Sequence, residues 1–143
     1  MKTQLLAIIA IFVWSIGAQN ALNASPAIPK DPYIGGSVSR STFTSAVVKR
    51  EPIDRVTTVN NKRPFVYFFT ELKGMAGQTV THRWEHNGEI VAENQFKVGA
   101  PKWRVWSARV LPPHRPGQWT VSVINAADEI VHSRHLDYVI NAN

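Results

Sequence analysis

The chain has 143 residues, with 16 Lys and Arg against 10 Asp and Glu, five Trp and no Cys. This length is typical of one domain with a core large enough to fold without cross-links. The lack of Cys excludes thiolate-bound zinc, iron–sulfur clusters, thiol catalysis, disulfides and a lipid anchor on an N-terminal Cys. The net charge of +6 favours acidic partners, although the basic residues are scattered along the chain, as solubility alone would also require.

The N-terminus has the pattern of a secretory signal peptide. Lys2 precedes the apolar run LLAIIAIFVWSIGA, which is shorter than the roughly 20 residues of a transmembrane helix. We expect a signal peptide at 1–18, with cleavage after Ala18 or as late as Ala24; the alternative is an uncleaved signal anchor. The protein is therefore expected to be exported, to keep no stable membrane span after cleavage, and not to bind nucleic acid.

Residues 19–40 predict a flexible linker or arm, because Pro and Gly recur there without hydrophobic periodicity. The folded domain is expected at 41–143. Asn87-Gly88 is a strong signal for a tight hairpin turn, since both residues tolerate a positive φ. Alternation and turn residues predict strands at 41–49, 55–59, 65–72, 79–86, 89–98, 103–111, 118–125 and 130–140.

No stretch outside the signal shows the periodicity of an amphipathic helix. Seven or eight strands separated by turn signals about every 8–12 residues indicate an all-β domain. We predict a single antiparallel β-sandwich of immunoglobulin-like type. A small closed barrel is the second choice.

Two strand registers stay open at this point. Trp103 and Trp106 are three residues apart, so they point to opposite faces of a regular strand. We favour Trp106 in the core, because the opposite register buries Ser107 and Arg109. Phe65–Leu72 is apolar on both faces; it either forms a hairpin with the next predicted strand or the loop between them crosses to another sheet.

The sequence contains no nucleophile elbow, zinc-protease, phosphate-loop or dinucleotide-binding motif. His82 and His86 lie on one strand face, but Trp84 separates them and no carboxylate joins them, so His82 is expected to be a neutral core histidine. Glu71, Glu85, Glu89 and Glu93 are expected to be solvated strand residues rather than a glycosidase acid and base pair. We therefore expect no catalytic residue, no metal and no cofactor.

Basic and aromatic residues alternate in two places, HisArgTrp at 82–84 and LysTrpArgValTrp at 102–106. Arg and Trp are favoured in binding sites, since they combine large contact area, stacking and charge-assisted hydrogen bonds. The alternative is a Trp-rich core with Arg stems across its rim. The candidate ligand-binding residues are Tyr67, Glu71, Arg83, Trp103 and Arg104.

The segments YFFTELKGMAGQTVTHRWEHNGEIVAE, VGAPKWRVWSARVLPP and GQWTVSV resemble a bacterial domain family of unknown function in exported or membrane-tethered proteins. The resemblance covers about Phe43–Val139, including the Arg-Glu-Pro of 50–52. It implies a β-sandwich at the cell envelope, periplasmic or secreted, with no established activity. Ala108 departs from the family pattern, in which a second Ser often stands there, and so does the stretch 126–129, where a Gly-containing turn is usual.

The function we expect is that of a non-enzymatic module that binds an envelope glycan or protein through this aromatic and basic face. The alternatives are a structural or dimerisation domain of an envelope assembly and a small envelope hydrolase. The sequence does not identify the ligand, the partner or the oligomeric state.

Overall fold

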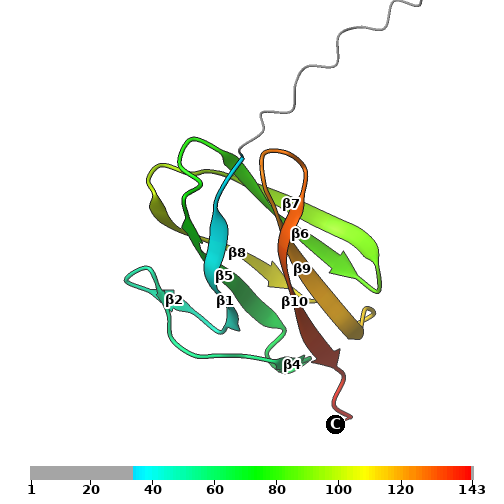
Figure 1. Ribbon diagram of the computed structural model, residues 1–143. Coiled ribbons are helices and arrows are strands. Elements are labelled where there is room, and N and C mark those ends of the chain that lie inside the picture. Colours follow the sequence, from blue (N-terminus) through cyan, green and yellow to red (C-terminus); the bar gives the residue numbers. More distant parts are fainter. Residues whose placement is uncertain (1–33, 143) are drawn as a thin grey trace, which may run out of the picture.

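The computed structural model describes residues 34–142, and this part of the chain is all-β (Figure 1). The predicted signal peptide and most of the predicted arm lie outside these residues, but β1 begins at Ser37, inside that arm. The strands are β1 (Ser37–Thr44), β2 (Val47–Val48), β3 (Glu51–Pro52), β4 (Thr58–Asn60), β5 (Phe65–Lys73), β6 (Thr79–His86), β7 (Glu89–Lys97), β8 (Lys102–Val110), β9 (Gly117–Ile124) and β10 (Ile130–Val139).

Two sheets face each other and enclose the core. One has the strand order β1-β5-β8 and the other β4-β10-β9-β6-β7, while β2 and β3 form a separate small hairpin. All pairings are antiparallel except that of the short strand β4 with β10. The predicted antiparallel β-sandwich is therefore confirmed, and Asn87 and Gly88 adopt the positive φ angles, 48° and 83°, that the predicted turn requires.

Strand β5 is apolar on both faces because it is the centre of the three-stranded sheet. Val66, Phe68 and Leu72 face the core, whereas Phe69 and Glu71 lie on the outer face and are nevertheless buried. The chain crosses to the other sheet after β5, so β5 and β6 do not pair. This settles the open question in favour of the crossing loop.

The preference for Trp106 in the core is wrong. Trp103 lies opposite the buried Leu72 and packs against the core, whereas Trp106 lies opposite Phe69 on the outer face. The prediction rested on the cost of burying Ser107 and Arg109. Burial of Ser107 costs little, because its hydroxyl accepts a hydrogen bond from Trp84 Nε1 at 2.9 Å, and Arg109 is only half-buried near the end of β8.

A chain of hydrogen bonds links the two sheets through His82, which is fully buried as expected for a core histidine. Its Nδ1 lies 2.9 Å from Ser107 Oγ and its Nε2 lies 3.0 Å from Thr70 Oγ1. The Thr70 hydroxyl donates its only proton to the Val105 carbonyl oxygen at 3.5 Å, so it accepts from Nε2–H of His82. The unprotonated Nδ1 of the neutral ring then accepts from Ser107. Burial lowers the pKa of His82 to about 3, so the ring is neutral and serves as both donor and acceptor.

Candidate functional site

The outer face of the three-stranded sheet carries an ionic cluster centred on Glu71. This carboxylate accepts hydrogen bonds from Ser39 Oγ at 2.9 Å, Arg40 at 3.0 Å and Arg104 Nε at 3.0 Å. Arg40 and Arg104 stand on the two edge strands, β1 and β8, and Glu71 stands between them on β5. A bulge between Val38 and Arg40 lets neighbouring residues of β1 reach the same carboxylate.

Burial by itself raises the pKa of Glu71, but the hydrogen bonds from Arg104, Ser39 and Arg40 outweigh it and lower the pKa to about 2. The carboxylate is therefore ionised at every physiological pH. Lys102 adds a longer contact at 3.8 Å. Glu71 is a fixed anion that organises the arginines around it.

The β2–β3 hairpin covers this cluster through the Arg-Glu-Pro of 50–52. Glu51 makes a bidentate salt bridge with Arg40 and a second salt bridge with Arg104 at 3.0 Å. The Arg50 guanidinium carbon lies 5.3 Å from the Trp103 ring centroid, which is a cation–π distance. The hairpin thus bridges the two edge strands of the sheet across its outer face.

The turn of this hairpin is strained. Lys49 and Arg50 have φ angles of 50° and 64°, in a region where Asn and Gly are normally found. We expect Lys49→Asn to raise the free energy of unfolding by about 0.5 to 1 kcal/mol, because Asn adopts this conformation more easily. Urea unfolding measures the change. Lys62→Asn, at an exposed turn residue, is the control, and an equal gain there would contradict the explanation.

A groove of about 400 Å³ runs between the edge strands β7 and β8. Trp103 and Trp106 line one side and Phe96 the other, and Arg104 reaches in from β8. A smaller hollow of about 320 Å³ adjoins it, lined by Arg50, Trp103 and Arg104 among others. The two hollows share Trp103 and Arg104, and we call the larger one the β7–β8 groove.

The structure brings together three of the five candidate residues: Glu71 and Arg104 are hydrogen-bonded, and Trp103 lies beside Arg104 in the groove. Tyr67 is half-buried on the same strand as Glu71, but its ring packs edge-on against Phe65 at 5.0 Å and does not line the groove. Arg83 lies apart: it belongs to β6 of the other sheet, where its Nε donates to Glu93 at 2.7 Å.

Four further residues, two in the Glu71 cluster and two in the groove, were not identified from the sequence as site residues. Arg40 lies in the stretch assigned to the arm, Glu51 in a break between strands, and Trp106 was assigned to the core. Phe96 follows the expected alternation of its strand, but sequence alone does not show that it faces β8. The sequence did indicate two of them: Glu51 belongs to the Arg-Glu-Pro triplet of the family resemblance, and Trp106 belongs to the basic and aromatic run at 102–106.

The histidines do not form a joint metal site in residues 34–142. Both ring nitrogens of His82 are held by hydroxyls, and His86 Nε2 lies 2.8 Å from the Pro116 carbonyl oxygen. No group of three or more His, Asp or Glu that could hold a metal occurs within this range.

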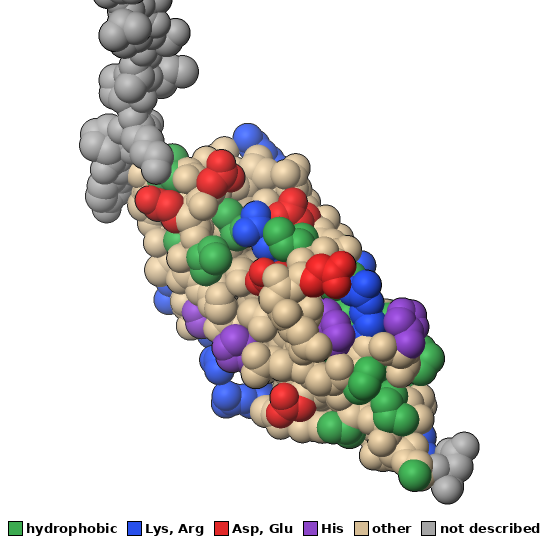
Figure 2. Space-filling view, turned by 90° about the vertical axis from the view of Figure 1, so that its right-hand side faces the viewer, with side chains coloured by type: hydrophobic (Ala, Val, Ile, Leu, Met, Phe, Trp, Pro, Cys, Tyr) green, Lys and Arg blue, Asp and Glu red, His purple; other side chains and the backbone are tan. Residues whose placement is uncertain are grey.

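The surface charge is mixed. Figure 2 shows acidic, basic and hydrophobic side chains interspersed on the face it presents, without one large patch of a single sign. This distribution matches the scattered basic residues of the sequence. Any preference for an anionic ligand must therefore come from local sites rather than from the field of the whole domain.

Fold and site together define a β-sandwich domain with an aromatic and basic groove along one open edge. Residues 77–136 match the model of a family described as "Protein of unknown function (DUF2914)". The match runs from the start of β6 through most of β10 and includes Trp103, Arg104 and Trp106. It agrees with the expected resemblance to a family of unknown function.

A search of curated proteins gave no match. Between residues 34 and 142 there is no helical segment with the length and hydropathy needed to cross a membrane.

Proposed function

We propose that this domain is a non-enzymatic, exported binding module for an acidic glycan of the cell envelope, and that the glycan lies in the β7–β8 groove. One observation carries the proposal: two indole rings and Phe96 line an open groove of about 400 Å³ that also contains Arg104 and Lys97. Indole rings offer broad apolar faces to the C–H surfaces of sugar rings. The neighbouring cations would hold carboxylate or phosphate groups of the polymer.

The chemistry of the carboxylates supports a binding role rather than catalysis. A general acid must hold a proton near neutral pH, but the pKa of Glu71 is lowered to about 2. Its oxygens are also occupied by Ser39, Arg40 and Arg104. Export is supported by the signal-like pattern of residues 1–18.

Tryptophan fluorescence tests the proposal. Trp84 and Trp119 are fully buried, so a ligand in the groove changes the emission of Trp103 and Trp106. We expect a saturable change on titration with acidic peptidoglycan fragments. Trp106→Ala should weaken binding about ten-fold or more, because it removes one wall of the groove.

Trp106 is the better variant because Trp103 also packs against the core. Phe65→Ala is the matched control, since Phe65 is an exposed aromatic residue on β5 outside the groove. A flat titration would contradict glycan binding. An equal loss of affinity in the two variants would show that the effect does not arise in the groove.

A further inference from the structure

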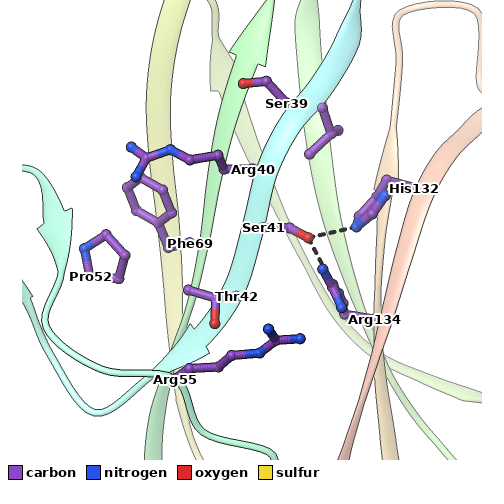
Figure 3. A pocket seen from close by; sticks show the side chains of 10 residues that line it. Ser39, Arg40, Ser41, Thr42, Pro52, Arg55, Phe69, His132 and Arg134 are labelled. Carbon is purple, nitrogen blue, oxygen red and sulfur yellow. Dashed lines mark hydrogen bonds between the residues drawn. The ribbon is translucent and has the colours of Figure 1, made fainter.

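A second opening lies at the other edge of the sandwich, where β1 faces β10 (Figure 3). It forms there because β4 pairs only with Asp137–Val139, which leaves the preceding part of β10 without a neighbour on that side. The cavity measures about 360 Å³. The polar residues that line it are Ser39, Arg40, Ser41, Thr42, Arg55, His132 and Arg134.

Arg134 is held in place by a hydrogen bond from the Nε atom of its guanidinium group. Its Nε donates to Ser41 Oγ at 3.0 Å, and Ser41 Oγ lies 2.6 Å from His132 Nε2 (Figure 3). The Arg134 Nε–H and the His132 ring thus hold the Ser41 hydroxyl between them. The two terminal nitrogens of Arg134 have no hydrogen-bond partner among residues 34–142, so an oriented pair of donors remains free.

His132 supports this arrangement as a neutral group. Burial and then the charge of Arg134 lower the pKa of its ring. The ring therefore adds no positive charge beside Arg134 near neutral pH. Ser41 and His132 act as positioning residues for Arg134.

The positive charge in this opening is not compensated. Arg55 and Arg134 form no ion pair with any residue that the structure describes, and no Asp or Glu lines the cavity. A small neighbouring hollow is lined by the same two arginines together with Ser41 and Thr42, again without a carboxylate. Arg40 differs, because its terminal nitrogens are bonded to Glu51 and Glu71.

From this geometry we propose that the β1–β10 cavity binds a tetrahedral oxyanion group, a phosphate or a sulfate, between Arg134 and Arg55. The two cations come from different segments, a strand and a loop, and approach the opening from different directions (Figure 3). A planar carboxylate is matched by one guanidinium fork, whereas a tetrahedral anion presents oxygens to both. This site lies at the edge opposite the β7–β8 groove and does not depend on glycan binding there.

Titration calorimetry of the purified protein with inorganic phosphate, at constant ionic strength and pH 7.5, tests the site. We expect saturable binding that Arg134→Gln and Arg55→Gln each weaken about ten-fold. Ser41→Ala should weaken it less, about three-fold, and Ser41→Thr should restore it, because only the orientation of Arg134 is lost. Thermal melting of each variant checks that it is folded.

Arg109→Gln removes the same charge outside the cavity and is the matched control; it should retain the affinity for phosphate. The absence of saturable binding, an equal loss in Arg109→Gln, or acetate binding as tightly as phosphate would overturn the proposal. These results leave the Trp106 experiment untouched, so the two proposals fail separately.

Two further probes identify the molecule that carries the anion. Binding of glycerol 3-phosphate without sedimentation on vesicles of equal parts phosphatidylglycerol and phosphatidylcholine assigns a soluble phosphate. Sedimentation on those vesicles that is lost in Arg134→Gln assigns a lipid headgroup. Both outcomes support an oxyanion site. If neither glycerol 3-phosphate nor the vesicles bind, the result counts against the site.

Discussion

Replacing Glu71 with Ala is expected to destabilise the domain by about 2 kcal/mol, because hydrogen bonds to a charged acceptor are lost. The change removes the carboxylate that accepts from Ser39, Arg40 and Arg104, and it leaves the two arginines with Glu51 alone. The Glu71 side chain is only 5% exposed, but Arg40 and Arg104 are 44% and 28% exposed, so water partly screens the charges that remain. Equilibrium unfolding in urea measures the difference.

Glu93→Ala is the matched control, because Glu93 makes one salt bridge to Arg83 and is 42% exposed. That variant should lose less than about 1 kcal/mol. Similar losses in the two variants would show that the Glu71 cluster is an ordinary surface network.

The low pKa of Glu71 also predicts acid lability. Its pKa is about 2 in the folded protein and 4.5 as the reference value, so the unfolded chain takes up the proton first. The stabilisation is complete above about pH 4.5 and is lost as the pH falls toward 2. The Glu71→Ala variant should lack this part of the acid transition.

A larger acid effect is expected from His82. Its pKa is about 3 in the folded protein against a reference value of 6.5. Between these two pH values the unfolded state is protonated at His82 and the folded state is not. Stability should therefore fall as the pH drops below 6.5, by about 1.4 kcal/mol per pH unit from this group alone. Between pH 7 and pH 4 the loss amounts to about 3 kcal/mol.

His82→Gln tests the assignment, since the amide offers a donor and an acceptor but does not titrate. Urea unfolding at pH 7 and pH 4 should show a fall in stability that is smaller in the variant by about 3 kcal/mol. His132 also has a lowered pKa, but it titrates in both proteins and cancels in the comparison. Equal pH dependence in the two proteins would show that His82 is not the group responsible.

The strands could be predicted because the local signals are strong. Thr79–His86 has the predicted bounds, and Asn87-Gly88 forms the predicted turn between β6 and β7. Alternation and turn preferences depend on a few neighbouring residues, so they can be recognised from a single sequence. Sheet membership is different, because it depends on which distant strands pair.

The errors at the candidate site follow from this difference. Arg83 and Trp103 belong to similar basic and aromatic patterns, but the loop after β5 places β6 in the opposite sheet, where Glu93 takes the Arg83 guanidinium. Ser107 was expected to avoid the core, because a sequence does not show that Trp84 will donate to its hydroxyl. Arg40 was assigned to the arm on the composition of the residues before it.

The shared carboxylates connect the two open edges of the sandwich. Arg104 lines the β7–β8 groove and Arg40 lines the β1–β10 cavity, yet both bind Glu51 and Glu71. Each carboxylate binds both guanidinium groups at the same time, so the ionic cluster cross-links the two edge strands β1 and β8 across β5. One pair of acidic residues therefore orients a wall residue of both openings, and a substitution of Glu51 or Glu71 is expected to alter the groove and the cavity together.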